Sequence, residues 1–505
     1  MELRKKIAQS ICVEVRMPEL DSEEKIENLK RNIQENQWGS IIIFEGEIHS
    51  SSKLISELQE LVDIPLFVCS DLERGAGQHF KGATDIPSNM AIAATNNLDL
   101  AYKAAKITAQ EAKDIGVNVI FSPSVDINNN PDNPIINIRS FGENPQKVAD
   151  FGQAFIKGAV AENVLTTPKH FPGHGDTSED SHVKTPVIKK SKSELNKMEL
   201  FPFRQVLEET DGIMTAHIIV PALDKSKVPA TISKEIIVGL LRNTYNFQGL
   251  IFTDALMMGG IIDEKSFELM AYTAGCDILL MPRDPIKTLD EIVEAVNSGE
   301  ITEERVNESC DRVLKFKNKY IDKTFKPNLK RVKSEKNTNL AKLIAEDAIT
   351  KVIAKNKLPL NKEKTIHILI DQDDEDNIWQ TLKDGLNEKS IETILINSKT
   401  VKDDLEGMNE KIKDKETVIL SFFSHIKAWK TNLYPEKFVI EWLETNLLKN
   451  KNTIVVAYSN PYFIKKVCGI KDYYCTFSDS TYSQEAVIKV LFENAKAKGI
   501  SPISL

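Results

Sequence analysis

Short apolar runs recur along roughly the first 285 residues, each followed by turn residues and then by a stretch with helical spacing. Eight such runs are present: "SICVEV", "GSIIIF", "IPLFVC", "VNVIFS", "NVLTTP", "DGIMTA", "GLIFTD" and "CDILLM". Strands of a half-exposed antiparallel sheet would alternate between apolar and polar residues. Because these runs are apolar on both faces, they predict strands of a parallel sheet that is covered by helices.

The stretches between the runs supply those helices. Apolar positions recur at three- and four-residue intervals in residues 22–36, 99–115, 144–163 and 233–245, as expected for amphipathic helices. Eight strand–helix units within this length fit a (β/α)8 TIM-type barrel better than an open sheet.

The pattern changes after two further predicted helices in residues 290–321. A Lys-rich, aromatic-poor stretch follows, and beyond it the runs "TIHILID", "ETILIN", "TVILSFF" and "NTIVVAYS" alternate with helical segments. This alternation predicts a smaller three-layer α/β sandwich. We therefore expect an α/β protein with a barrel catalytic domain over 1–325, a linker over 326–340 and a C-terminal α/β sandwich domain over 341–505.

Composition and charge narrow the range of partners. The 505 residues are 41% hydrophobic and 28% charged, with a formal net charge of −9, which argues against nucleic acid or an anionic membrane as a partner. We expect a small substrate, and the oligomeric state is left open. The start "MELRKKIAQS" has no apolar core behind it, and no uncharged run is long enough to span a membrane, so we expect a cytoplasmic protein.

The six cysteines are scattered, without a C-x-x-C pair, and three of them lie in apolar strand-like runs. This distribution favours buried reduced thiols over disulfides.

Charged residues follow the predicted strands at the points where barrel enzymes carry their active sites. They are Asp71, Asp126, Lys169, His170, His217 and Asp254. Charged groups at such places cost desolvation energy unless they are paired. We therefore expect a shared polar site, although ion pairs such as Lys169 with Asp126 could also serve only to hold the barrel mouth.

One loop, "KHFPGHGDTSEDSH" at residues 169–182, concentrates these groups and admits three interpretations. His170, His174 and Asp176 could ligate zinc, since the two histidines have i, i+4 spacing. The loop could instead supply acid/base and substrate-binding groups. The third interpretation is a merely polar surface loop.

This loop resembles the signature loop of the family 3 glycoside hydrolases, in their β-N-acetylglucosaminidase (β-N-acetylhexosaminidase) branch. "GLIFTDALMMGGI" is similar to the nucleophile segment of that branch, and "RSFGENP", "PATIS" and "AVNSGEITEERVNESCDRVL" follow the family's order. In the second domain, "VVAYSNPYFI" and "YSQEAVIKVLFENAKAKGISPISL" resemble the family's carboxy-terminal sandwich. The resemblance covers nearly the whole chain.

The resemblance implies that Asp254 is the nucleophile and that His182, paired with Asp180, is the general acid/base. A retaining glycosidase needs one group to attack the anomeric carbon and another to protonate the leaving oxygen. Asp180 and His182 stand two residues apart, so in an extended segment they point the same way. A carboxylate against one imidazole nitrogen fixes the tautomer and leaves the other nitrogen for the substrate.

The resemblance further implies that Asp71, Arg139, Lys169 and His170 bind the hydroxyls of the terminal sugar, and that neither a metal nor a cofactor is needed. Charged hydrogen bonds to hydroxyls are strong and selective. One stretch departs from the branch pattern D-x-E-G-G-R-V-x-R, because it reads "DLERGAGQH" here and places His79 where an arginine is expected. The preference for the group beyond the scissile bond is therefore open.

We thus expect a retaining exo-β-N-acetylglucosaminidase that removes non-reducing terminal GlcNAc from peptidoglycan fragments or chitin oligosaccharides through a covalent glycosyl-enzyme. A β-N-acetylglucosaminide phosphorylase is an alternative, because a histidine donor repels phosphate less than a carboxylate would. An enzyme that also accepts β-glucosides is another. A non-enzymatic carbohydrate-binding protein would be expected to have lost the nucleophile or the donor, and both are present.

Overall fold

The computed structural model describes residues 1–177, 185–258, 266–322, 326–372, 377–426 and 433–505. They form two compact units. The first consists of Met1–Asp85, Ala101–Asn130 and Pro145–Asn337, and the second of Ile86–Leu100, Pro131–Asn144 and Thr338–Leu505. The sequence had indicated two contiguous domains, whereas two segments from within the first 325 residues pack with the second unit.

The stretch expected to be a linker, 326–340, has structure of its own. It contains the short helical turn η6 (Leu329–Arg331) and the start of α12 (Glu335–Ala348). The Arg331 guanidinium forms an ion pair with Asp114, and the Lys333 N–H donates to Glu111 Oε1 at 2.8 Å. These contacts tie most of the stretch to the first unit, because two carboxylates on one barrel helix accept from it.

All eight predicted strands are present in the first unit, and all pair in parallel. They are β1 (Ile11–Arg16), β2 (Ser40–Phe44), β4 (Phe67–Ser70), β6 (Val119–Ile120), β7 (Leu165–Thr166), β8 (Gly212–Met214), β9 (Leu250–Phe252) and β10 (Leu279–Leu280). A minor two-stranded sheet joins β3 (Gly46–Glu47) to β5 (Phe80–Lys81).

The eight strands close into a barrel. Six of them pair in the order β10-β1-β2-β4-β6-β7, and β8 pairs with β9. A parallel bridge between Phe252 and Ile278 joins β9 to the start of β10, and another between Phe171 and Thr215 joins the segments that follow β7 and β8. One hydrophobic cluster takes a side chain from every strand: Cys12, Ile42, Phe67, Val119, Leu165, Met214, Leu250 and Leu280. This filled interior is what a (β/α)8 barrel requires.

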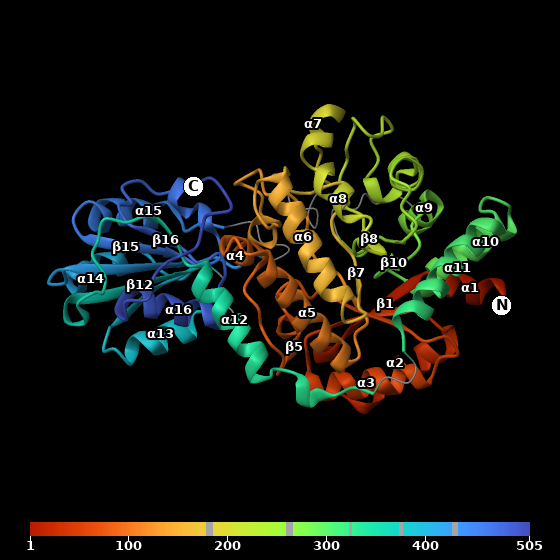
Figure 1. Cartoon of the computed structure of the whole chain (residues 1–505), viewed down its shortest axis with the longest axis horizontal. Helices are drawn as coiled ribbons and strands as arrows, with labels where there is room; N and C mark the ends of the chain where they lie inside the picture. The colour runs from red at the N-terminus through yellow and green to blue at the C-terminus, as the bar shows by residue number, and fades with distance from the viewer. Residues whose placement is uncertain (178–184, 259–265, 323–325, 373–376, 427–432) are drawn as a thin grey trace. The chain divides into compact units, whose positions relative to one another are not determined.

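Helices cover the outside of the barrel (Figure 1). They are α1 (Leu3–Ala8), α2 (Glu23–Asn36), α3 (Ile48–Glu60), α5 (Leu98–Ile115), α6 (Pro145–Val160), α7 (Lys192–Lys197), α8 (Leu200–Val206), the π-helical η5 (Glu235–Thr244), α9 (Phe267–Ala274), α10 (Pro285–Asn297) and α11 (Glu303–Tyr320). Of these, α2, α5, α6, η5, α10 and α11 lie where the helical spacing predicted them. α11 shows why such helices form where they do. The Thr302 hydroxyl accepts from the Arg305 N–H at 3.2 Å, Glu303 and Glu304 occupy the positive N-terminal turn, and two lysines lie in the last turn.

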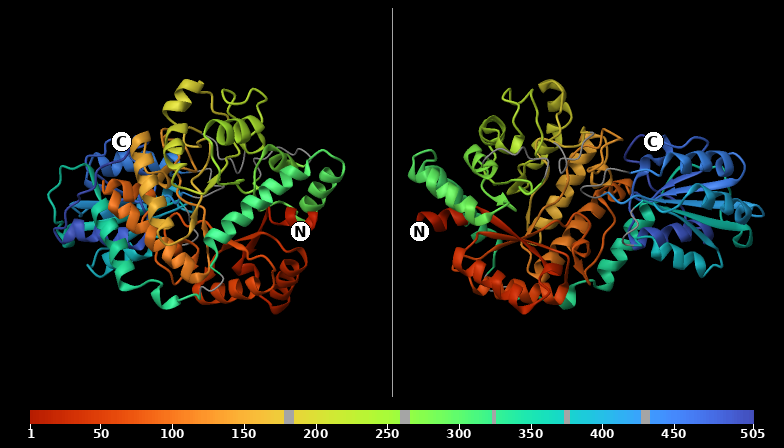
Figure 2. Two further views of the ribbon diagram at one scale, coloured as in Figure 1. Left: turned by 45° about the vertical axis from the view of Figure 1, so that its right-hand side comes forward. Right: turned by 180° about the vertical axis from the view of Figure 1, so that it is seen from behind.

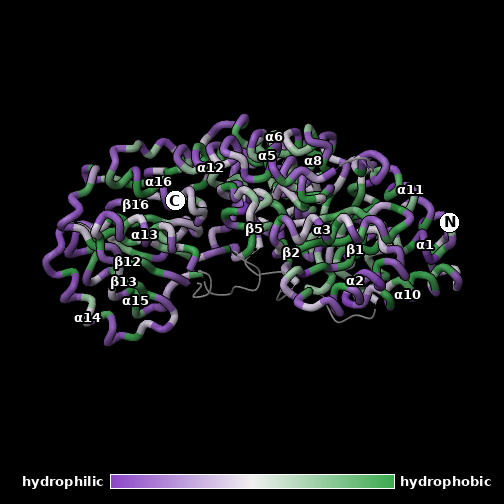
Figure 3. The backbone as a smooth tube through the Cα atoms, turned by 90° about the horizontal axis from the view of Figure 1, so that it is seen from below, coloured by the Kyte–Doolittle hydropathy of each residue, from purple (hydrophilic) through white to green (hydrophobic). Residues whose placement is uncertain are grey.

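Hydropathy along the chain differs between the strands inside the barrel and the helices that cover it. The tube in Figure 3 is mostly green along β1 and β2 and alternates between purple and green along the helices. All six cysteines are free, and five of them are buried as expected, whereas Cys468 is exposed. Among the described residues, none of the helices combines the length and the apolar character needed to cross a bilayer.

The second unit is the predicted three-layer sandwich (Figure 2). Its sheet has the order β11-β16-β15-β14-β12-β13, parallel except for β11 against β16. The strands are β11 (Thr350–Ile353), β12 (Thr365–Asp371), β13 (Thr393–Ile396), β14 (Thr417–Phe423), β15 (Asn452–Ala457) and β16 (Tyr473–Cys475). Four of these were predicted, whereas β11 and β16 are short and were missed.

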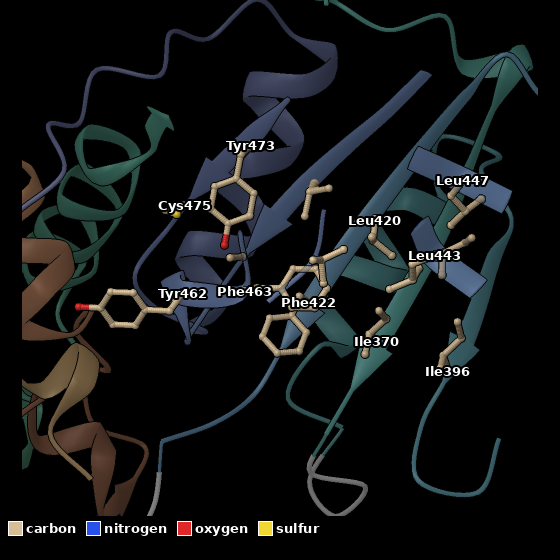
Figure 4. Packing of buried hydrophobic residues seen from close by; sticks show 14 of the residues in the cluster. Ile370, Ile396, Leu420, Phe422, Leu443, Leu447, Tyr462, Phe463, Tyr473 and Cys475 are labelled. Atoms are coloured by element: carbon tan, nitrogen blue, oxygen red, sulfur yellow. The ribbon is translucent and has the colours of Figure 1, made fainter. Parts of the chain in front are cut away.

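Alternate residues of this sheet feed two cores. Ile368, Leu420 and Phe422 face α14 (Lys402–Ile412), α15 (Lys437–Trp442) and η8 (Leu443–Leu448), and Figure 4 shows part of this cluster. Leu369 and Ile419 face α12, α13 (Gln380–Asn387) and α16 (Thr481–Phe492). The first of these cores also takes in α4 (Asn89–Ala94), the turn η3 (Asn137–Arg139) and the turn η9 (Pro461–Lys465).

Candidate active site

Charged side chains from different strands meet at the carboxyl ends of the barrel strands. Lys169, which follows β7, is 3% exposed, and its Nζ lies 2.6 Å from Asp71 Oδ1 and 2.8 Å from Glu73 Oε1. Both carboxylates follow β4, and Asp71 is the more exposed of the two. Such a buried ammonium is tolerated because two acceptors compensate for its lost hydration. The second acceptor fixes the lysine while Asp71 keeps an accessible edge.

A second charged group lies beside the first. Asp126, after β6, is fully buried, and its Oδ2 lies 2.7 Å from His170 Nδ1 and accepts from the Ser124 hydroxyl at 3.0 Å. Its Oδ1 accepts from the His174 N–H at 2.6 Å. Asp126 thus orients the ring of His170, which leaves Nε2 of that ring as its outward nitrogen. The sequence had suggested an ion pair between Lys169 and Asp126. In the structure Lys169 pairs with Asp71 and Glu73, and Asp126 contacts His170.

These contacts determine the charge state of Asp126. Burial opposes its ionisation, but the His170 ring and the His174 N–H more than offset burial, and they hold the pKa of Asp126 at about 2. Asp126 is therefore an anion near pH 7.

His174 has the opposite character. Burial and the neighbouring His170 lower the pKa of His174 to about 4, against the pull of the Asp126 and Asp254 carboxylates. Its Nδ1 lies 2.9 Å from the Thr177 hydroxyl. The ring is therefore neutral near pH 7, so it contributes polar atoms but no positive charge to the site.

Asp254 follows β9 and is half-buried, with its Oδ1 accepting from the Ala255 N–H at 2.8 Å. The turn that carries it is held by His217, whose Nε2 lies 3.2 Å from the Ala255 carbonyl and whose Nδ1 lies 2.8 Å from the Thr231 hydroxyl. The Asp254 carboxylate opposes, as a minor influence, the lowering of the His174 pKa by burial.

The remaining residues predicted for the site lie elsewhere in the described structure or outside it. Arg139 belongs to the second unit, where its Nη1 donates to the Ile135 carbonyl at 2.9 Å. Asp180 and His182 lie outside the described residues. The structure thus brings Asp71 into contact with Lys169 and His170 close to His174, and it places Asp254 on the turn after β9.

Sequence reasoning missed Glu73 and assigned His174 only to the metal interpretation. The signal for Glu73 was its place two residues after Asp71 in "DLERG". A 5% exposed carboxylate at a strand end calls for a cation, and Lys169 was available. For His174, the signal in the sequence was its place in a loop that holds several other charged and polar residues.

The metal interpretation of the loop can be compared with these contacts. Nδ1 of His170 faces Asp126, and Nδ1 of His174 faces Thr177. Among the residues that the structure describes, no group of three His, Cys, Asp or Glu side chains is arranged to hold a metal ion.

The fold and this site together define a class, that of barrel enzymes that act through carboxylates and histidines at the carboxyl ends of their strands. Residues 2–316 match the Glycosyl hydrolase family 3 N terminal domain. The chain therefore belongs to glycosyl hydrolase family 3, and it is a glycoside hydrolase acting on O-glycosyl bonds.

Individual relatives agree with this assignment. The chain is 37% identical over 318 residues to beta-hexosaminidase A of Pseudoalteromonas piscicida, a match that covers 56% of this chain and 53% of that protein. The chain thus matches about half the length of this relative.

Solved structures cover the chain more completely. A family 3 β-N-acetylglucosaminidase from Paenibacillus sp. str. FPU-7 is similar with a TM-score of 0.88 and 28% identity, over 100% of this chain and 99% of that one. A beta-glucoside phosphorylase, BglX, is similar with a TM-score of 0.88 and 25% identity, over 100% of this chain and 94% of that one.

Proposed function

We propose that the protein is a retaining exo-β-N-acetylglucosaminidase that releases non-reducing terminal GlcNAc through a covalent intermediate on Asp254. The observation that carries the proposal is the position of Asp254. It follows β9 at the end of the barrel where Asp71 and Lys169 also lie, on a turn held by His217. A carboxylate fixed in this way is suited to attack an anomeric carbon.

The remaining groups have complementary roles in this proposal. Asp71, Lys169 and His170 hold the hydroxyls of the terminal sugar, and Arg139 adds a further charged donor. Because Lys169 is already paired with Glu73, Asp71 can accept from a hydroxyl without leaving a buried cation unbalanced. We assign proton transfer at the leaving oxygen to His182 with Asp180, on the strength of the sequence resemblance.

The experiment that tests the proposal is turnover of an aryl β-N-acetylglucosaminide. Asp254→Ala should lower kcat/KM by about 10³-fold or more, because no other group replaces a missing nucleophile. A circular dichroism spectrum and melting temperature close to those of the wild type would show that the fold is intact.

A matched control is Asp290→Ala. Asp290 is an exposed aspartate on α10 that forms an ion pair with Arg4, and such surface pairs contribute little to stability. This variant should keep kcat/KM within about twofold of the wild type. Activity that survived Asp254→Ala in a folded protein would reject Asp254 as the nucleophile.

Phosphorolysis is the second candidate, and the similarity to a beta-glucoside phosphorylase favours it. Phosphate would replace water in opening the glycosyl-enzyme, and the product would be a sugar 1-phosphate. Running the reaction with and without phosphate distinguishes the two. A sugar 1-phosphate that forms only with phosphate would establish phosphorolysis, whereas its absence would dismiss this candidate.

The substrate range is a further part of the proposal. We favour peptidoglycan fragments, followed by chitin oligosaccharides, with β-glucosides as an additional possibility. A set of aryl glycosides that differ only at the 2-position measures this directly. A site selective for GlcNAc should prefer the 2-acetamido substrate by at least tenfold in kcat/KM over the 2-hydroxy one, and equal rates would indicate the broader activity.

A further inference from the structure

Lysines gather at one edge of the sheet in the second unit. Strands β12, β14, β15 and β16 pair in parallel, so their amino ends share an edge, and the antiparallel β11 ends at that edge. Nine lysines lie within four residues of these strand ends and are here called the lysine row. They are Lys355, Lys357, Lys362, Lys364, Lys413, Lys415, Lys449, Lys451 and Lys471.

Contacts between members confirm that the row is continuous. Lys451 Nζ donates to the carbonyls of Lys413 and Lys415 at 2.6 and 3.1 Å. Lys355, Lys451 and Lys471 together line a small cavity of about 60 Å³. Because neighbouring strands of a sheet lie about 4.8 Å apart, the five strand ends span about 20 Å. The positive charges therefore follow one another along the edge of the sheet.

Most of the row has no carboxylate partner. Lys364 pairs with Glu416, and Lys413 lies 3.9 Å from Glu410. The other seven lysines form no ion pair within the part of the chain that the structure describes. Five of these seven are exposed, namely Lys355, Lys357, Lys362, Lys449 and Lys471. Their charge is therefore available to a ligand.

The segments that carry the row are basic in a chain that is acidic as a whole. They are residues 355–364, 413–416, 449–452 and 471–472. Together they hold nine lysines and four acidic residues, whereas the chain has a formal net charge of −9. One of these acids, Asp472, is buried and accepts from the N–H groups of Lys355 and Asn356 at 2.6 and 2.9 Å. Such a local excess of positive charge attracts polyanions.

Helix ends explain only part of the row. Lys413 and Lys449 are the C-cap residues of α14 and η8, and lysines are favourable beside the negative C-terminal end of a helix. Lys355 and Lys357 follow a strand, and Lys471 directly precedes one. Since these three lysines lie beside no α-helix end, the helix dipole does not account for them.

The residue types of the row indicate which polyanion fits. Its segments contain no arginine and no aromatic residue. They therefore lack the planar fork that recognises phosphate or bases in a fixed geometry, and they lack the rings on which the bases of single-stranded nucleic acid stack. Lysine is a flexible point charge. The matching partner presents phosphate oxygens alone, without bases.

The shape of the charged region favours a linear partner over a bilayer. Beside the row, between the ends of α13 and α16, Lys389 already pairs with Glu493 at 2.7 Å. The unpaired positive charge is thus confined to a strip along the strand ends. A bilayer would present its anionic headgroups across a plane, whereas a linear chain meets only the strip.

We propose that the lysine row binds inorganic polyphosphate, a linear chain of phosphate groups, which lies across the ends of β11, β16, β15, β14 and β12. Every repeat of this chain is anionic, so a row of lysines can contact it in any register. The contact uses no residue of the first unit. Because binding releases counterions, the affinity falls as the salt concentration rises.

The test is a titration of end-labelled, long-chain polyphosphate with the full chain, followed by fluorescence anisotropy. The affinity should fall by about 100-fold between about 50 and 200 mM salt, as expected when about five lysines neutralise phosphates. The triple variant Lys355→Gln, Lys449→Gln, Lys471→Gln should bind at least about 20-fold more weakly at the lower salt concentration. All three lysines are exposed, so the fold should tolerate their replacement.

A matched control changes the net charge equally at the opposite edge of the sheet. Lys399 and Lys402 follow the carboxyl end of β13, and Lys437 begins the helix that follows β14; all three are exposed. The triple variant Lys399→Gln, Lys402→Gln, Lys437→Gln should keep the affinity for polyphosphate within about threefold of the wild type. Both triple variants should keep kcat/KM for an aryl β-N-acetylglucosaminide within about twofold, because no replaced residue belongs to the barrel.

Three outcomes would overturn the inference. One is equal weakening in the two triple variants, because the protein would then respond to net charge and not to the row. Another is the absence of salt-sensitive binding by the wild type. The third is tighter binding of oligothymidylate with the same number of phosphates, or of phosphatidylglycerol vesicles, which would assign the row to single-stranded nucleic acid or to a membrane.

Discussion

At the scale of single residues, the site depends on anions that are buried and paired. Asp126 has no exposed surface, and it orients His170 and the N–H of His174. Glu73 has the same relation to Lys169. In each case one carboxylate holds a group in place so that another part of that group can face the substrate, as second-layer carboxylates do for metal-bound histidines.

Asp126→Asn tests this role. The variant keeps the size of the side chain but loses the charge that orients His170, so kcat/KM for an aryl glycoside should fall by about 10-fold to 100-fold. The free energy of unfolding should also fall, by about 3 kcal/mol at pH 7, because a buried partner is removed. An unchanged kcat/KM would show that His170 does not depend on Asp126.

The difference in unfolding free energy between the wild type and Asp126→Asn should depend on pH in one direction. The pKa of Asp126 in the folded protein, about 2, lies below the ordinary value of 3.8. Its charge therefore stabilises the fold fully above about pH 4, and this contribution is lost as the pH falls through 2. The gap in unfolding free energy between wild type and Asp126→Asn should shrink by about 2 kcal/mol over that window. Urea unfolding measured at several pH values would detect it.

At the scale of elements, the loops that follow neighbouring strands contact each other and fix each other's conformation. The loop after β7 passes so close to the loop after β6 that a Cβ on Gly175 would lie 1.7 Å from the Ile127 carbonyl oxygen. Asn130 Nδ2 donates to the carbonyls of Asp176 and Thr177 at 3.3 and 3.2 Å. The path of the loop after β7 is therefore set by a second loop as well as by its own sequence.

Gly175→Ala should disturb this path while leaving the barrel folded. We expect kcat/KM to fall by about 100-fold, because side chains on both sides of the glycine would shift. The control is Gly407→Ala in α14, where a Cβ would meet no atom within 4 Å. That variant should be neutral, or more stable by up to about 1 kcal/mol. Equal activity in the two variants would contradict the account.

The elements also show what the sequence could predict. All eight barrel strands followed from their apolar runs, because burial on both faces leaves a strong pattern, and α2, α5, α6, η5, α10 and α11 followed from helical spacing. β11 and β16 carried no such pattern, since "TKVI" and "YYC" are short. In the site, strand-end positions identified Asp71, Lys169 and Asp254, whereas the pairing of Lys169 with Glu73 depends on how two separate loops approach one another. Periodicity carries no information about that approach.

At the scale of the whole molecule, the carboxyl and amino ends of the barrel strands have different roles. Opposite the site, before β10, the Asp277 carboxylate accepts from Arg242 at 2.6 Å, from Ser309 at 2.7 Å and from the Ile251 N–H at 2.9 Å, and it pairs with Arg312. This network ties α11 and η5 to the strands. Groups at the amino end of a barrel serve stability rather than chemistry.

Asp277→Asn should therefore lower the free energy of unfolding by about 3 kcal/mol, since two half-buried arginines lose their buried counter-charge. The value of kcat/KM at a temperature well below the melting point should change by less than about threefold. Denaturant unfolding and steady-state kinetics on the same preparation measure both quantities. A large loss of activity in the folded variant would contradict the division between the two ends.

The central claim is that Asp254 forms a covalent bond to the sugar, and trapping that bond tests it most directly. A 5-fluoro derivative of GlcNAc with a good leaving group slows both steps and lets the glycosyl-enzyme accumulate. After peptic digestion, mass spectrometry should find one added fluorosugar on the peptide containing "GLIFTDALMM", attached to Asp254. A label on another carboxylate, or hydrolysis of the natural substrate with inversion at the anomeric carbon, would contradict the account.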